Sequence, residues 1–206
     1  SFCGWATSHL TGDGDSGITS THTYTHAVNI NGSTKTVNGV QFTGSNAISG
    51  SNWSLTTGFT NLHNSNASPV SGQIGEILGD GFRYAGDPQK IKLSGLIPGQ
   101  IYTFSIYSRA WGTDRNCILS SSALSQTIMV NQDQFSSSAQ DGLLVECSYY
   151  APGTEVEFTI DPVVGNTTWH LYAFSNREGK SNLITNTATS GPLDSSTDSP
   201  VSIGLS

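Results

Sequence analysis

The chain has 206 residues, of which 35% are hydrophobic, 11% are charged and 23 are glycine. This length is enough for one all-β domain with a substantial core, and the low charge with abundant Gly, Ser, Thr and Asn favours a turn-rich β protein over a helical one. A formal net charge of −7 without a cluster of Lys and Arg argues against a nucleic-acid or anionic-membrane partner. No apolar run approaches the roughly 20 residues of a membrane span, so we expect no membrane insertion.

Most of the chain alternates apolar and polar residues with a period of two, which is typical of half-buried strands. After a Gly/Asp-rich N-terminal loop over residues 1–20, the pattern predicts strands over residues 21–30, 36–43, 52–56, 125–131, 143–150, 154–160 and 169–175. Residues 71–84 contain the one predicted helix, because Ile74, Ile77 and Leu78 follow helical spacing behind a Ser cap.

The most regular pattern lies in residues 89–111, where apolar side chains recur at every second position on both sides of Pro98-Gly99. Proline presets φ and glycine tolerates a positive φ, which is the pairing that a type II turn requires. The segment is therefore predicted to be an antiparallel β-hairpin that leads directly into a loop around Trp111.

Beyond Asn176 the composition changes to Ser, Thr, Asn, Pro and Gly, with almost no large apolar side chain until Val201. Such a segment buries too little surface to offset its ordering entropy. We therefore place a β-sandwich domain over residues 1–178 and a tail or linker over residues 179–206. The strands predict an all-β fold, a two-sheet antiparallel β-sandwich of jelly-roll type with one short helix, and an immunoglobulin-like sandwich is the alternative.

The three cysteines, Cys3, Cys117 and Cys147, lack the CxxC spacing of zinc or thioredoxin-like sites. Three disulfide pairings are open, and a cross-sheet bridge between Cys117 and Cys147 is possible because both fall in strand-like stretches. The alternative is that all three cysteines are small buried side chains. Few Lys, many Ser and Thr and a single Met suit an extracellular setting. Because the chain begins with Ser1, we expect a mature or excised segment of a larger protein, with neighbouring domains, that is itself monomeric.

Several segments together carry a family resemblance: THTYTHAVNINGS, TVNGVQFTG, NWSLTTG, IKLSGLIPGQIYTFSIYS and TWHLYAFSN. Over residues 12–176 they resemble bacterial extracellular β-sandwich domains that look like carbohydrate-binding modules of the galactose-binding type. The resemblance implies a jelly roll, a secreted or cell-surface location, and attachment to multidomain proteins that are often polysaccharide-active. It brings no agreed set of binding residues.

Aromatic residues in loops provide the best candidates for a binding site. Sugars stack their apolar C–H faces on Trp and Tyr, while their hydroxyls need charged or amide partners. The loop around Trp111 offers both, and the loop before residue 89 could form the opposite wall. We therefore predict a glycan site that comprises Trp111, Arg109, Asp114, Arg115, Asn116, Tyr84 and Asp87. The alternative is that Trp111 plugs the end of the sandwich while Arg115 pairs with Asp114.

Two further features suggest chemistry. Asp13 and Asp15 are candidate ligands for a structural Ca²⁺, which prefers carboxylate and carbonyl oxygens. Glu155 and Glu157 alternate on one strand face about 7 Å apart, a separation that glycoside hydrolysis could use. A solvated outer face is the simpler interpretation of this pair, and we expect His170 to pack in the core rather than bind a ligand.

Three functions follow from these observations. The first is a non-catalytic carbohydrate-binding module of a secreted or surface multidomain protein, which binds polysaccharide. The second is a structural or adhesive spacer without a ligand. The third, which the residues favour least, is a polysaccharide hydrolase or lyase.

Overall fold

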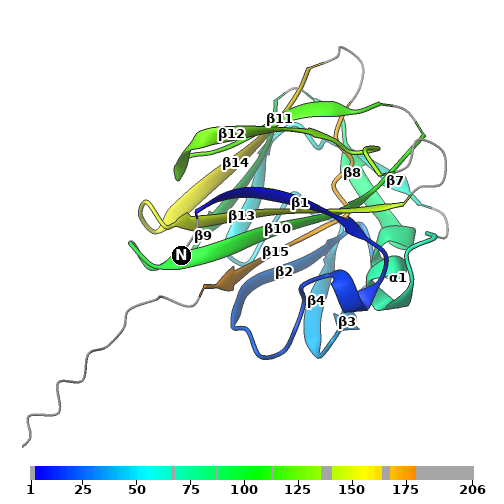
Figure 1. Cartoon of the computed structure of the whole chain (residues 1–206), viewed down its shortest axis with the longest axis horizontal. Helices are drawn as coiled ribbons and strands as arrows, with labels where there is room; N and C mark the ends of the chain where they lie inside the picture. Colours follow the sequence, from blue (N-terminus) through cyan, green and yellow to red (C-terminus); the bar gives the residue numbers. More distant parts are fainter. Residues whose placement is uncertain are drawn as a thin grey trace, which may run out of the picture.

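The computed structural model describes residues 3–65, 68–86, 88–112, 114–135, 141–163 and 168–179. These residues form two large β-sheets that pack face to face, with a helix at one side (Figure 1), which confirms the predicted all-β sandwich. Within this part of the chain, no helix is long and apolar enough to cross a membrane. Of the predicted tail, only Gly179 lies within the described residues.

The larger sheet has seven strands, and every pair of adjacent strands in it is antiparallel except one. Its order is β1 (Gly4–Leu10), β13 (Gly142–Tyr150), β10 (Ile101–Arg109), β15 (Ala173–Glu178), β2 (Tyr24–Ile30), β4 (Val40–Ser45) and β3 (Lys35–Val37). The parallel pair is β2 with β4.

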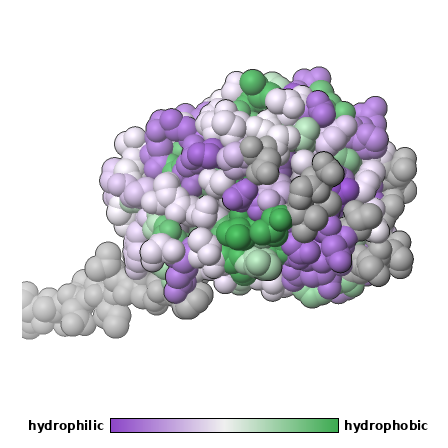
Figure 2. Space-filling view, turned by 90° about the horizontal axis from the view of Figure 1, so that it is seen from above, coloured by the Kyte–Doolittle hydropathy of each residue, from purple (hydrophilic) through white to green (hydrophobic). Residues whose placement is uncertain are grey.

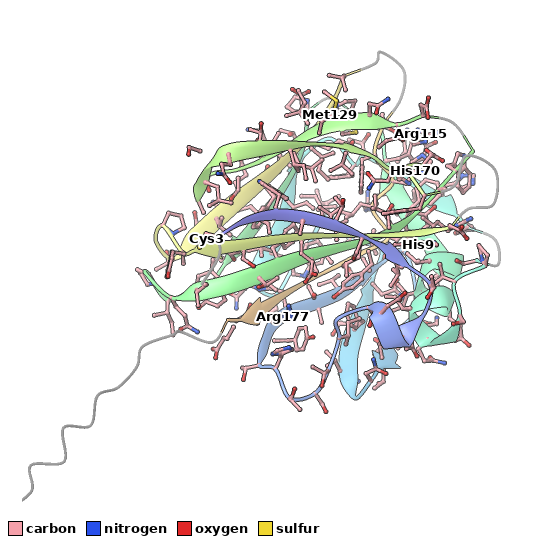
Figure 3. All side chains as sticks on the ribbon, viewed as in Figure 1. Cys3, His9, Arg115, Met129, His170 and Arg177 are labelled. Carbon is pink, nitrogen blue, oxygen red and sulfur yellow. The ribbon has the colours of Figure 1, made fainter. Side chains whose placement is uncertain are left out.

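The second sheet has six strands in the order β12 (Leu124–Asn131), β11 (Asn116–Ser121), β14 (Glu155–Pro162), β9 (Gln89–Ser94), β6 (Trp53–Thr57) and β5 (Ser49–Gly50). Its outer face carries Met129, which is 64% exposed and lies at the top of Figure 3. Seen from that side, Figure 2 shows a compact apolar area within a largely polar surface. A separate two-stranded sheet pairs β7 (Asn61–Asn64) with β8 (Gly81–Tyr84).

Two hydrophobic cores cover the two faces of β10, which is buried along its whole length. The first lies between the sheets, where Phe104 stacks on Phe158 with ring centroids 3.9 Å apart. The second lies on the outer face of the seven-stranded sheet beneath α1 (Gly72–Asp80). The buried face of α1 consists of the predicted Ile74, Ile77 and Leu78 together with a glycine, so the helix prediction is confirmed.

The predicted hairpin over residues 89–111 is wrong. Gln100 N donates to Ile97 O at 3.1 Å and Gly99 has φ of +79°, so the Pro-Gly turn is present. However, β9 belongs to the six-stranded sheet and β10 to the seven-stranded sheet. An arch that connects two sheets places alternate residues in the shared core just as a hairpin does. The alternation alone therefore cannot distinguish an arch from a hairpin.

Other boundaries also differ from the sequence pattern. The strand predicted over residues 36–43 is a hairpin of β3 and β4, because Asn38 and Gly39 both have positive φ and form a turn. The last strand begins at Ala173 rather than at residue 169, and β1 and β7 were not predicted. A short 3-10 helix, η1 (Asp13–Asp15), lies in the N-terminal loop.

The cysteines form no disulfide. Cys117 and Cys147 both lie in the core between the sheets and are small buried side chains, as the alternative to a disulfide predicts, whereas Cys3 is only partly buried. Burial raises the pKa of the Cys147 thiol to about 12, which keeps it protonated and unreactive.

Candidate functional site

A pocket of about 350 Å³ opens at the end of the sandwich where β10 ends. Four separate segments contribute its walls, and the lining residues are His63, Phe82, Tyr84, Ala85, Gly86, Trp111, Arg115, Thr168 and His170. In Figure 3, Arg115 and His170 lie close together at this end of the molecule. The pocket thus brings together three of the predicted site residues, Trp111, Arg115 and Tyr84.

Interlocked rings form the floor and one wall of the pocket. Phe82 stacks on His170 with centroids 4.1 Å apart and planes 14° apart. Trp111 meets both rings edge-on, 5.0 Å from Phe82 and 5.1 Å from His170. His63 and Tyr84 also contact this cluster. Because each ring contacts several others, the half-buried Trp111 is held in one orientation before any ligand arrives.

Arg109 supports Trp111 from behind and does not line the pocket. It is the last residue of β10 rather than a loop residue, and its side chain is buried. The guanidinium lies 5.1 Å from the Trp111 ring centroid and 5.5 Å from that of Tyr172, and Nε donates to Leu78 O at 3.1 Å. These buried cation–π contacts hold the indole ring of Trp111 in place.

Asp133 holds the backbone of the Trp111 loop and was not predicted from the sequence. Its Oδ1 accepts hydrogen bonds from Trp111 N at 2.6 Å and Gly112 N at 2.8 Å. Burial raises the pKa of Asp133, although these bonds act in the opposite direction. The sequence feature that could have identified Asp133 is the Asn131-x-Asp133 spacing, which is typical of an Asx-type turn. In the structure, Asn131 Oδ1 accepts a hydrogen bond from Asp133 N, as such a turn requires.

Arg115 is half-buried at the pocket wall, where its Nη1 donates to Thr168 O at 2.9 Å. Burial lowers the pKa of its guanidinium. Asp114 instead accepts a hydrogen bond from Asn131 Nδ2 at 3.0 Å, so the alternative surface pair of Arg115 with Asp114 is absent among the described ion pairs. Asn116 begins β11 opposite Asn131 and does not line the pocket. Asp87 lies outside the described residues.

His170 is 4% exposed, and its stacking on Phe82 confirms the predicted packing role. Burial, reinforced by the nearby Arg115, His63 and Arg109, lowers the pKa of its imidazole to about 2. The ring is therefore neutral at ordinary pH, and its Nδ1 has no hydrogen-bond partner in the described part of the chain. His170 thus belongs to the core and to the pocket wall at once.

The two aspartates predicted as calcium ligands act as hydrogen-bond acceptors. Asp13 accepts from Gln73 N at 3.1 Å and Ile74 N at 2.9 Å, and so caps α1 in place of the predicted serine. Asp15 accepts from Thr11 N and Gly12 N in its own turn. Among the described residues, no group of three or more His, Cys, Asp or Glu side chains is arranged to hold a metal. The calcium site stays a prediction.

The two glutamates considered for hydrolysis lie on the other side of the sandwich, on β14. Glu155 pairs with Lys92 at 2.8 Å, and Glu157 pairs with Lys90 at 3.0 Å. Each carboxylate thus faces a lysine across the strand pair of β14 and β9, as expected for the outer face of a sheet.

Comparison with known proteins identifies the fold. No protein-family model matches the chain, and the comparison with curated proteins found no match. Among solved structures, a β-glucuronidase from Bacteroides uniformis aligns over 75% of this chain with a TM-score of 0.58 and 10% identity. The ANXUR1 extracellular domain from Arabidopsis thaliana aligns over 76% of this chain and 49% of its own, with a TM-score of 0.53 and 10% identity.

The alignment covers only 18% of the β-glucuronidase chain, so the similarity concerns one part of that enzyme. CBM35 from Cellvibrio japonicus Abf62 aligns over 62% of this chain and 94% of its own at 11% identity, but its TM-score of 0.39 is too low to support a conclusion. The β-sandwich fold that the predicted resemblance implies is confirmed.

Proposed function

We propose that this chain is a non-catalytic carbohydrate-binding module of a secreted or cell-surface protein, and that it binds glycan in the pocket beside Trp111. The observation that carries the proposal is the combination of Trp111 and Tyr84 with the Arg115 guanidinium in one open pocket. Aromatic faces suit the C–H face of a sugar ring, and the guanidinium suits its oxygen atoms. The similarity to part of a β-glucuronidase and to an extracellular domain supports this assignment.

The pocket is also prepared for binding. Asp133 fixes the backbone at Trp111, while Arg109 and Phe82 fix its ring. Ordering a side chain on binding costs about 0.5–1.5 kcal/mol, and a side chain that is already held avoids most of this cost. A preformed aromatic wall is the arrangement that a binding module without catalytic groups requires.

Affinity gel electrophoresis against a panel of soluble polysaccharides tests the proposal. Trp111→Ala is expected to weaken retardation by about tenfold in affinity, because stacking and the buried area of the indole are lost. Tyr150→Ala is the matched control, since Tyr150 is 52% exposed and pairs with Ile101 at the opposite end of β10. If no polysaccharide retards the parent protein, the spacer function replaces this proposal.

A further inference from the structure

The described wall of the pocket carries a cation but no acid. Among its described lining residues, Arg115 is the only Arg or Lys, and none is Asp or Glu. The aromatic rings, Thr168 and two small residues complete the wall. Of the lining residues that the structure describes, a ligand therefore meets a single strong charge, and that charge is positive.

Arg115 has hydrogen-bonding capacity that the protein leaves unused. A guanidinium offers five N–H donors, and one bond to the protein, Nη1 to Thr168 O, is observed for this side chain. Its Nε is buried without a partner, and no described carboxylate lies within 4.0 Å of its nitrogens. Burial lowers the pKa of the group, because a partly desolvated cation is costly unless an anion compensates it.

Neither Asp133 nor Asp114 forms an ion pair with Arg115. Asp133 stabilises Arg115 electrostatically. Its Oδ1 accepts the backbone N–H groups of Trp111 and Gly112, and its buried Oδ2 has no hydrogen-bond partner among the described residues. Asp114 is exposed and accepts a hydrogen bond from Asn131. Within the described part of the chain, the Arg115 guanidinium therefore has no ion-pair partner.

We propose that the pocket takes a carboxylate-bearing sugar, a uronic acid residue of a polysaccharide, with its carboxylate on Arg115 and its ring face against Trp111. This inference rests on the function proposed above. A guanidinium matches a carboxylate in both charge and planar geometry, and such charge-assisted bonds are about twice as strong as neutral ones. A neutral sugar offers only hydroxyls and brings no negative charge to Arg115.

The overall negative charge of the chain excludes general electrostatic attraction as the cause of binding to an acidic polysaccharide. At a net charge of −7 the protein as a whole repels a polyanion. Retention of an acidic polysaccharide therefore depends on a local cation rather than on general attraction. Arg177, which pairs with Glu146 at 3.3 Å and lies far from Arg115 in Figure 3, provides a matched arginine outside the pocket.

The test uses affinity gels that contain polygalacturonate, alginate or hyaluronan, each beside a sample whose carboxyl groups have been reduced to primary alcohols. We expect native protein to be retarded by at least one of these uronans and to lose about tenfold or more in affinity on carboxyl reduction. Arg115→Met is expected to lose a similar factor, and Arg177→Met to bind like the parent. Carboxyl reduction alters only the ligand, so this arm does not depend on whether the variant folds.

Each of five results would overturn the inference. Equal retardation by native and carboxyl-reduced uronans, or unchanged binding by folded Arg115→Met, would remove Arg115 and the carboxylate from recognition. Stronger retardation by dextran sulfate than by every uronan would assign the pocket to sulfate esters. Retardation by neutral polysaccharides alone would leave the proposed function standing without the uronate, whereas no retardation by any polysaccharide would remove both.

Discussion

His170 is expected to make the stability of the folded chain depend on pH. In the folded state, burial beside Phe82 and the nearby Arg115 lowers the pKa of its imidazole to about 2. In the unfolded state the pKa of histidine is about 6.5. Because the folded-state pKa is the lower one, the unfolded chain binds a proton first as the pH falls. The stabilisation is therefore complete above pH 6.5 and decreases progressively below it.

The magnitude follows from this linkage. Each pH unit well below 6.5 costs about 1.4 kcal/mol, so the contribution of His170 falls by about 2 kcal/mol between pH 7 and pH 5. For a chain of this size that corresponds to roughly 4–8 °C in melting temperature. Burial also lowers the pKa of His26, which adds to the loss, while the raised pKa of Asp133 acts in the opposite direction. Only a comparison of variants isolates His170.

The assay is urea unfolding at pH 7 and pH 5 for the parent and for His170→Phe. Phenylalanine retains a ring to stack on Phe82 but does not titrate, so the loss of unfolding free energy between the two pH values should be about 2 kcal/mol smaller in the variant. His9→Gln serves as the control, because its side chain is 42% exposed. If His170→Phe loses as much stability as the parent, His170 is not the buried neutral group described above.

Three further outcomes concern stability. Asp13→Ala is expected to lower the free energy of unfolding by about 1–2 kcal/mol through loss of the α1 cap, equally with calcium and with chelator in urea titrations; a loss seen only with calcium would instead mark Asp13 as a metal ligand. Gly99→Ala is expected to cost about 1 kcal/mol in the same assay, because its φ is +79° and a Cβ there meets no atom within 4 Å; an unchanged midpoint would contradict this backbone strain. Dithiothreitol should leave the thermal midpoint unchanged, because Cys117 and Cys147 form no disulfide; a lower midpoint would show one.

The sequence pattern predicted which residues are buried better than it predicted which strands pair. Leu93 on β9 and Phe104 on β10 both point into the shared core, as their alternation indicates. Whether the connection at Pro98-Gly99 folds back within one sheet or crosses to the other depends on backbone hydrogen bonds to distant strands, here β14 and β13. Those long-range partners leave no trace in the local period.

The candidate site was predictable only in part, for a similar reason. Trp111 and Arg115 were identifiable because they lie close together in a polar loop, and Tyr84 because it lies shortly before residue 89, where the predicted hairpin begins. His63 and Phe82 come from β7 and β8, whose short pairing has no clear period in the sequence. Arg109 was predicted as a ligand group because it neighbours Trp111 in sequence, but as the last residue of β10 its side chain points into the interior.

The pocket and the second core are physically continuous, and this affects how binding data should be interpreted. Phe82 belongs to that core, and Tyr84 and Trp111 pack against it. Replacement of Tyr84 or Trp111 therefore lowers stability as well as binding, because the same ring contacts serve both. Arg115 is half-buried and makes one observed side-chain hydrogen bond, to Thr168 O. Its replacement changes the charge of the pocket with the least effect on packing, so it separates recognition of a ligand from maintenance of the fold more cleanly than any aromatic position.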